Sequence, residues 1–143
     1  MRVIKFRAWN KSSPHPHMID IESVMYDEKN SVSICGYPLD RDNGGFTHLE
    51  GDKFDLMQFT GLTDKNGVDI YEGDIMLKVM VDDSIHRCVI RYSDKYAKFV
   101  FCPIMEKWDF DMDAVDNPYE RQSYEVIGNI HENPELMESK NVQ

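Results

Sequence analysis

The chain has 143 residues, of which 41% are hydrophobic and 29% charged, the composition of an ordinary globular protein with one domain or one domain and a small appendage. Its 16 Lys and Arg are outnumbered by 26 Asp and Glu, so the formal net charge is -10. Nonspecific binding to a phosphate backbone depends on Lys and Arg, and docking on anionic lipid depends on them too. The sequence therefore predicts no direct nucleic-acid binding and no membrane partner.

The beginning of the chain and its cysteines bear on where the protein is found. No apolar run approaches the roughly 18 residues of a membrane span. The first residues return to charge at Lys5 and Arg7, too early for the apolar core of a signal peptide. Three Cys, an odd number at wide spacing, favour reduced thiols. We therefore expect a cytoplasmic protein.

The first portion of the chain, about residues 1–45, is predicted to form short strands. Apolar and basic residues alternate over residues 3–9 with the period of two that is typical of a strand. Two more apolar-polar runs, 18–26 and 31–36, flank an Asp-Glu-Lys-Asn turn and so predict a β-hairpin. Residues 37–45, with Pro and Gly-Gly, predict a loop that separates this N-terminal β-hairpin portion from the rest.

The second portion contains the clearest turn signals. Asn66-Gly67 is the pair that best tolerates positive φ at both centres of a type I′ turn, and Gly73 marks a second tight turn. The predicted strands, spaced as in small barrels, are residues 56–60, 68–71, 75–81, 85–92, 96–101, 108–114 and 124–130. We therefore predict a mainly β (α+β) fold with a small SH3-like β-barrel over residues 51–132.

The end of the chain and the core complete the predicted fold. Asn133 can cap a short helix and Pro134 can start it, so residues 133–143 are predicted to be a short helix or a disordered tail. The apolar positions of the predicted strands assign the core. We expect the following side chains to be mostly buried: Phe59, Ile70, Tyr71, Ile75, Val89, Phe99, Phe101, Trp108, Phe110, Val126 and Ile127.

Three blocks of sequence point to a known family. They are MRVIKFRAW at residues 1–9, MQFTGLTDKNGVDIYEGDI at 57–75 and YEVIGNIHENP at 124–134, and together they span nearly the whole chain. The sequence resembles the YopX family of phage and prophage proteins in these blocks. The resemblance implies a small, β-rich, phage-encoded protein of uncharacterised activity inside a host cell. It supplies no catalytic residues that could be transferred to this chain.

Gly61, Gly67 and Gly73 fall six residues apart in the middle block. Each stands where a strand must end or reverse, and backbone freedom at positive φ explains them without a ligand. A phosphate cradle would need consecutive glycines that lead into a helix, whereas this segment leads into strands. Asp74, which follows Gly73, is expected to accept backbone N–H groups, as in the Gly-Asp turn of SH3-like barrels.

An acidic run provides the most prominent candidate site. Asp109, Asp111 and Asp113 alternate with apolar residues, so a strand buried on one face projects the three carboxylates together into solvent. With Glu120 they also occupy places of a calcium-loop pattern, but Ala114 stands where that loop needs a glycine. A plain strand with an acidic face is therefore favoured, and a weaker cation site remains open.

Histidines and cysteines give weak signals. His15 and His17 could bind a metal together, but no Cys or carboxylate lies nearby at finger-like spacing. Cys88 and Cys102 lie in consecutive predicted strands and could face each other, although free Cys more commonly packs as a small apolar side chain. Cys35 has no His or Asn spaced to activate it, and the chain has no Gly-x-Ser-x-Gly motif. The sequence therefore predicts no catalytic, cofactor-binding or metal-binding residue.

Three classes of function remain open. The favoured class is a non-catalytic protein-binding module, since the predicted domain is small, β-rich and acidic and lacks catalytic motifs. Its expected partner is a host or phage protein, and a homo-oligomer is also compatible with the sequence. The residues predicted to bind the partner are Trp108, Asp109, Asp111 and Asp113. The alternatives are an acidic nucleic-acid mimic that blocks a host enzyme and a small metal-dependent enzyme that uses the carboxylates around Asp109.

Overall fold

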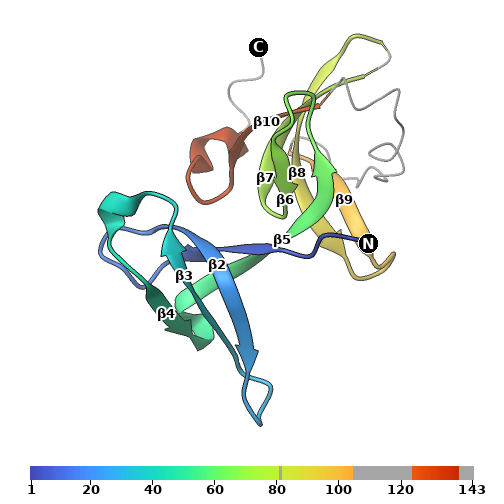
Figure 1. Ribbon diagram of the computed structural model, residues 1–143. Helices are drawn as coiled ribbons and strands as arrows, with labels where there is room; N and C mark the ends of the chain where they lie inside the picture. Colours follow the sequence, from blue (N-terminus) through green and yellow to red (C-terminus); the bar gives the residue numbers. More distant parts are fainter. Residues whose placement is uncertain (81, 105–123, 139–143) are drawn as a thin grey trace. The chain divides into compact units, whose positions relative to one another are not determined.

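The computed structural model describes residues 1–80, 82–104 and 124–138, and the chain divides into two compact units, Val3–Gln58 (unit 1) and Phe59–Gln143 (unit 2). Both units are built from antiparallel strands (Figure 1), which confirms the predicted mainly β fold. Helix in the described ranges is limited to three short 3-10 turns, η1 (Arg41–Asn43), η2 (Gly51–Lys53) and η5 (Pro134–Met137). None of the described helices is long and apolar enough to cross a membrane.

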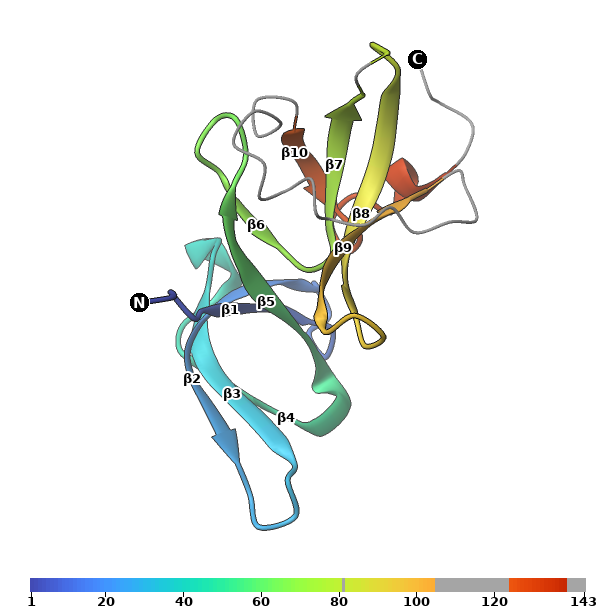
Figure 2. The same cartoon turned by 90° about the vertical axis from the view of Figure 1, so that its right-hand side faces the viewer.

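Unit 1 is built on an antiparallel sheet in which the strands follow the order β4-β3-β2-β1-β5. The strands are β1 (Phe6–Asn10), β2 (His17–Tyr26), β3 (Val32–Pro38), β4 (Thr47–Glu50) and the first half of β5 (Phe54–Thr63). The long β2–β3 hairpin can be followed in Figure 2. The buried side chains of this unit's core are Ala8, Ile19, Ile34, Leu49 and Phe54. The strands predicted in this portion are confirmed, and β4 is a short strand that the sequence did not predict.

The turn between β2 and β3 shows why the chain reverses there. The Asp27 carboxylate accepts hydrogen bonds from the backbone N–H groups of Lys29 (2.8 Å) and Ser31 (2.7 Å). Asn30 adopts a left-handed conformation with a φ of 60°, which Asn tolerates better than most residues. The predicted hairpin is confirmed, and the Asp27 side chain stabilises its turn.

Gly36 in β3 lies where β2 contains a bulge between Ile21 and Ser23. A Cβ atom at Gly36 would collide with the backbone carbonyl oxygen of Asp20. The close approach of the two backbones therefore requires glycine at this position.

Unit 2 contains the second half of β5, which pairs with β6 (Asp69–Tyr71), and a four-stranded antiparallel sheet in the order β10-β7-β8-β9. The four strands are β7 (Asp74–Val79), β8 (Ile85–Ser93), β9 (Lys98–Pro103) and β10 (Tyr124–Asn129). The buried core of the unit consists of Ile70, Met76, Cys88, Ile90, Val100, Phe101 and Tyr124. These strands confirm the predicted ones with small shifts at their ends, and the strand predicted at 108–114 lies outside the described residues.

The turn at residues 64–67 differs from the predicted type I′ turn. Of Asn66 and Gly67, only Gly67 has a positive φ, of 78°. The backbone N–H of Gly67 donates to the Asp64 carbonyl (3.0 Å), and that of Asp64 donates to the Val68 carbonyl (2.8 Å). This is a three-residue loop in which a type I turn precedes a left-handed glycine. The Asp64 carboxylate explains the difference, because it binds two N–H groups of the longer loop.

The predicted core is confirmed in part. Five of its members are buried: Phe59, Ile70, Ile75, Val89 and Phe101. Four others, Tyr71, Phe99, Val126 and Ile127, are half-buried. Trp108 and Phe110 lie outside the described residues.

The end of the described chain begins its 3-10 turn at the predicted place, with Pro134 in the first position. Asn133 takes the predicted N-cap position, but its side chain makes no hydrogen bond to the turn that follows it. Its Oδ1 instead accepts a hydrogen bond from the backbone N–H of Asn129 (3.2 Å), which closes the turn after β10. The division of the chain into domains at 1–45, 51–132 and 133–143 stays a prediction.

Candidate functional site

The residues predicted to bind a partner, Trp108, Asp109, Asp111 and Asp113, lie outside the residues that the structure describes, and so does Glu120. The acidic strand and the calcium-loop alternative therefore stay predictions. Within residues 1–80, 82–104 and 124–138, no group of three or more His, Cys, Asp or Glu side chains is placed to hold a metal ion.

The histidine pair at the start of β2 is described, with His15 in the preceding loop and His17 as the first residue of the strand. His17 Nδ1 lies 2.8 Å from the backbone carbonyl oxygen of His15. The carbonyl accepts a hydrogen bond from this nitrogen in the tautomer that satisfies both groups. A nitrogen that donates in this way has no lone pair for a metal, so this contact opposes a two-histidine site that uses Nδ1 of His17.

All three cysteines are free, and Cys35 and Cys88 are buried. Across the β8–β9 hairpin, Cys88 pairs with Pro103, whereas Cys102 pairs with Val89. Neighbouring residues of a strand point to opposite faces of the sheet, so Cys88 and Cys102 do not face each other. The expectation that the two cysteines could face each other is therefore wrong, because the strand register offsets them by one residue.

The three glycines of the middle block have left-handed backbones, with φ of 88° at Gly61, 78° at Gly67 and 79° at Gly73. Each therefore adopts a conformation in which other residues are strained, as the sequence predicted. The predicted strand end at Gly61 is wrong, because Gly61 lies within β5, at an irregularity in its pairing with β6. Asp74 is 1% exposed, and its Oδ2 accepts a hydrogen bond from the backbone N–H of Tyr71 (2.8 Å). This confirms the turn role expected for Asp74.

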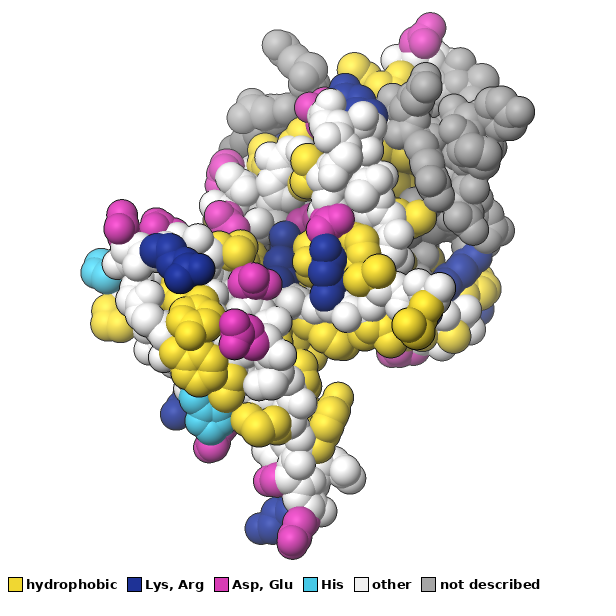
Figure 3. Space-filling view, in the orientation of Figure 1, with side chains coloured by type: hydrophobic (Ala, Val, Ile, Leu, Met, Phe, Trp, Pro, Cys, Tyr) yellow, Lys and Arg dark blue, Asp and Glu magenta, His cyan; other side chains and the backbone are white. Residues whose placement is uncertain are grey.

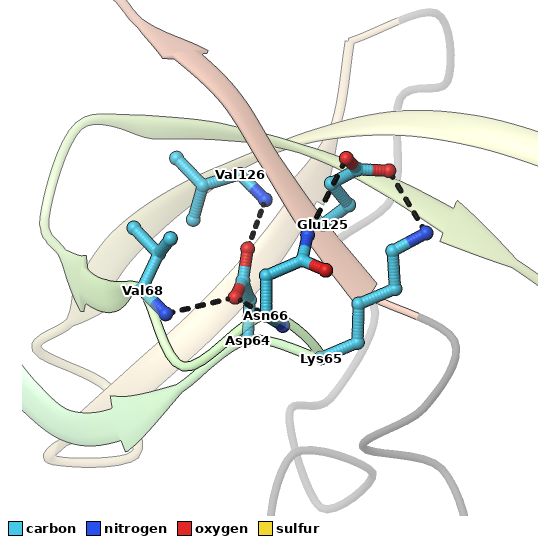
Figure 4. Close-up of polar contacts among 6 residues, drawn as sticks. All are labelled: Asp64, Lys65, Asn66, Val68, Glu125 and Val126. Carbon is cyan, nitrogen blue, oxygen red and sulfur yellow. Dashed lines mark hydrogen bonds and ion pairs between the residues drawn. The ribbon is translucent and has the colours of Figure 1, made fainter.

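Asp64 connects the β5–β6 turn to β10 (Figure 4). Its Oδ1 accepts hydrogen bonds from the backbone N–H groups of Asn66 (2.8 Å) and Val68 (3.0 Å). Its Oδ2 accepts one from the N–H of Val126 in β10 (3.0 Å). Asp64 is 6% exposed, and a carboxylate withdrawn from water needs such donors. The side chain thus joins two segments that are far apart in the sequence.

The neighbours of Asp64 repeat this connection nearer the surface. Lys65 donates its backbone N–H to the Tyr124 carbonyl (3.2 Å), and its Nζ lies 2.9 Å from Glu125 Oε2. Asn66 Nδ2 donates to Glu125 Oε1 at 3.5 Å. Because the Lys65 and Glu125 side chains remain well exposed, their ion pair adds little stability. The buried Asp64 carboxylate provides the stronger attachment.

Burial by itself raises the pKa of the Asp64 carboxyl group, but the backbone hydrogen bonds from Val126, Val68 and Asn66 outweigh that effect. The positive charge of Lys65 acts in the same direction, so the pKa lies below its ordinary value of 3.8. General acid–base catalysis instead favours a pKa near the working pH. The geometry and the charge of Asp64 therefore fit a structural role, which the sequence signalled only by an Asp at the start of a turn.

Lys78 lies on the core side of the β10-β7-β8-β9 sheet and is only 7% exposed. Its Nζ lies 5.3 Å from the ring centroid of Phe101 and 5.4 Å from that of Tyr124. The two rings stack on each other with centroids 4.9 Å apart. A cation over aromatic faces is attracted by the ring electrons, which helps to accommodate a lysine in a core. Strand alternation alone could not reveal this arrangement.

Hydrophobic side chains gather on the surface of unit 1 in the region of β3 (Figure 3). We call the residues Tyr37, Leu39, Arg41 and Phe46, which are close together in the sequence on and after β3, the β3–β4 cluster. Leu39 is 60% and Phe46 is 57% exposed. Phe46 packs edge-to-face on Tyr37 with centroids 5.3 Å apart, and Arg41 Cζ lies 5.4 Å from the centroid of the Tyr37 ring. Single exposed apolar side chains are common, whereas large contiguous apolar patches are typical of interaction surfaces.

The backbone between β3 and β4 holds this cluster in place. Asp40 Oδ1 accepts a hydrogen bond from the backbone N–H of Asp42 (3.0 Å) and so caps η1, the turn that includes Arg41. The sequence predicted a loop at 37–45 but did not identify its side chains as a surface. The available signal was the presence of large apolar residues in a segment otherwise rich in Asp and Gly.

The family model described as YopX protein matches residues 5–138 of this chain. The structure resembles the crystal structure of protein EF1440 from Enterococcus faecalis, with a TM-score of 0.64 and 32% sequence identity over 96% of this chain and 100% of that chain. It also resembles the crystal structure of protein yopX from Bacillus subtilis, with a TM-score of 0.58 and 23% identity over 100% of both chains. No curated protein matches the chain. The family match and the two solved structures agree with the resemblance in the sequence, and the chain belongs to the YopX family.

Proposed function

We propose that this protein acts by binding another protein, and that the β3–β4 cluster is the contact surface. The observation that supports the proposal is the contact of the exposed Phe46 and of Arg41 with the Tyr37 ring, in a segment that also exposes Leu39. Tyr, Phe and Arg are enriched in protein interfaces, and Tyr and Arg are among the residues that contribute most to binding energy. The ring contacts also order these side chains before a partner arrives, which lowers the entropy cost of association.

The wider setting of the proposal comes from the family. We infer a phage- or prophage-encoded protein that works in the cytoplasm of a host cell and has a host or phage protein as its partner. In this proposal residues 51–132 form a small SH3-like barrel. The short antiparallel strands of unit 2 and the left-handed glycines between them support that assignment. The acidic residues Asp109, Asp111 and Asp113 remain the second place where the partner could bind.

Affinity capture from host cells with a tagged chain tests the proposal. The test variant combines Leu39→Ser with Phe46→Ser, which removes exposed apolar area at two positions outside the strands. The matched control is Tyr26→Ser, since Tyr26 is 69% exposed in the same unit but lies at the end of β2. We expect the captured partner to fall at least about fivefold with the double variant, roughly 1 kcal/mol of binding free energy, and to stay at the parental level with Tyr26→Ser.

A second variant, with Asp109→Asn, Asp111→Asn and Asp113→Asn together, separates the two candidate surfaces. Loss of the partner with this variant alone would move the contact from the β3–β4 cluster to the acidic strand. An equal loss of captured partner with Tyr26→Ser would show that any exposed apolar side chain contributes nonspecifically to capture, which would contradict the proposal. Hydrolytic turnover that disappears with the triple variant would instead favour the metal-dependent enzyme.

A further inference from the structure

The end of the β8–β9 hairpin is a small cationic and aromatic surface on an acidic chain. Residues 91–98 contain three cations and one carboxylate, although the whole chain has a formal net charge of -10. Arg91, Lys95 and Tyr96 are exposed, and Lys98 is half-buried. We call the surface made by Arg91, Lys95, Tyr96 and Lys98 the hairpin-end patch.

The register of the hairpin brings the cations of this patch together. Arg91 pairs with Val100, and Ser93 pairs with Lys98. Arg91 and Ser93 share one face because side chains alternate along a strand, so Arg91 and Lys98 are diagonal neighbours on that face. Tyr92 and Phe99, on the other face, pack edge-to-face with ring centroids 5.4 Å apart. Their contact holds the two strands together just before the turn.

The turn adds the aromatic part of the patch. Lys95 Nζ lies 4.9 Å and Lys98 Nζ lies 5.8 Å from the centroid of the Tyr96 ring. The ring attracts both ammonium groups and therefore keeps them near each other despite their mutual repulsion. Tyr96 is itself 54% exposed, so it offers apolar area beside the positive charges.

We propose that the hairpin-end patch binds an acidic peptide segment of a partner protein. Carboxylates are the groups that the Arg91 fork and the Lys95 ammonium group recognise, and Tyr96 can pack against an apolar side chain between them. Ions in solution screen electrostatic interactions over more than about 8–10 Å at ordinary salt. A short acidic peptide on the patch is therefore attracted mainly by the nearby cations. A long polyanion would extend beyond the patch and be repelled by the carboxylates around it.

This inference concerns unit 2 and does not depend on the β3–β4 cluster. Its test is fluorescence anisotropy of the whole chain with a labelled peptide in which Glu and Leu alternate. The variant that combines Arg91→Glu with Lys95→Glu is expected to weaken binding at least about fivefold, which is about 1 kcal/mol. Tyr96→Ala is expected to weaken it too, whereas Tyr96→Phe should bind like the parent because it keeps the ring. The matched control is Lys29→Glu, an exposed lysine in the turn of another hairpin.

Three outcomes would overturn the proposal. Binding that survives the Arg91→Glu and Lys95→Glu changes would place the peptide elsewhere. A loss of the same size with Lys29→Glu would show a general charge effect without a site. Tighter binding of single-stranded oligothymidylate, lost in the same variant, would replace the acidic peptide with nucleic acid. The circular dichroism spectrum of each variant shows whether its strands are intact, and the peptide with Gln in place of Glu should not bind.

Discussion

Replacing Asp64 by Asn is expected to weaken unit 2 more than the small change in size suggests. The Asn side chain keeps Oδ1, which can still accept from the N–H groups of Asn66 and Val68. It places an NH₂ group where Oδ2 accepts from the N–H of Val126. Two donors then face each other, and leaving one buried donor unpaired costs about 1–3 kcal/mol. We therefore expect Asp64→Asn to lower the free energy of unfolding by about 2 kcal/mol.

Unit 1 contains a matched control for this experiment. Asp27 begins a loop of the same kind, and its Oδ1 also accepts two backbone N–H groups, those of Lys29 and Ser31. Asp27 is exposed, and among the described residues its carboxylate makes no third hydrogen bond to a distant strand, so Asn can replace it with little loss. We expect Asp27→Asn to change the free energy of unfolding by about 0.5 kcal/mol or less, as is usual at exposed sites.

Urea unfolding followed by circular dichroism measures both variants, and hydrogen exchange of the Val126 amide localises the effect. That amide should exchange faster in Asp64→Asn and at the parental rate in Asp27→Asn. The pKa of Asp64 is lower in the folded chain than its ordinary value, so the stability it contributes is complete above about pH 4 and is lost as the pH falls through the folded pKa. Equal losses in the two variants, or an unchanged Val126 amide, would refute this reasoning.

Three further substitutions test other parts of the fold, each by urea unfolding. Gly36→Ala is expected to lower the free energy of unfolding by about 1–3 kcal/mol, because the added Cβ collides with the Asp20 carbonyl oxygen. A urea midpoint equal to that of the parent would contradict the close approach of β2 and β3 at the bulge. Ala97→Gly should not lower the free energy of unfolding, because Ala97 has a left-handed φ of 52°, which glycine adopts without strain. A loss of about 1 kcal/mol, as for glycine inside an ordinary strand, would contradict the left-handed conformation of Ala97. Lys78→Met should stay within about 1 kcal/mol of the parent, since replacing a buried ion by an apolar side chain is often tolerated. A much larger loss would mean that the cation itself, over Phe101 and Tyr124, is essential.

Most of the strands were predictable because alternation and turn residues are local properties of the chain. The β2–β3 hairpin is an example, since its Asp27 and Asn30 act on residues close to them in sequence. β4 escaped prediction because Thr47–Glu50 is too short to show a period. The type I′ turn was predicted from Asn66-Gly67, whereas the Asp64 side chain determines the longer loop.

The candidate sites were less predictable because they depend on contacts between distant residues. Nothing near Asp64 in sequence indicates that Val126 will donate to it. Likewise, Lys78 meets Phe101 and Tyr124 only through strand pairing. The β3–β4 cluster is closer to a local feature, yet the contact of Phe46 with Tyr37 joins residues nine positions apart, on either side of η1. Sequence patterns could therefore predict the elements better than the surfaces.

The central claim is that a protein partner binds at the β3–β4 cluster, and hydrogen–deuterium exchange of the captured complex tests it most directly. The account predicts slower exchange at the backbone amides of residues 37–46 when the partner is bound, with the turn at 27–30 unchanged. It also predicts that the combination of Leu39→Ser and Phe46→Ser abolishes this protection. Protection confined to residues outside 37–46 would contradict the claim.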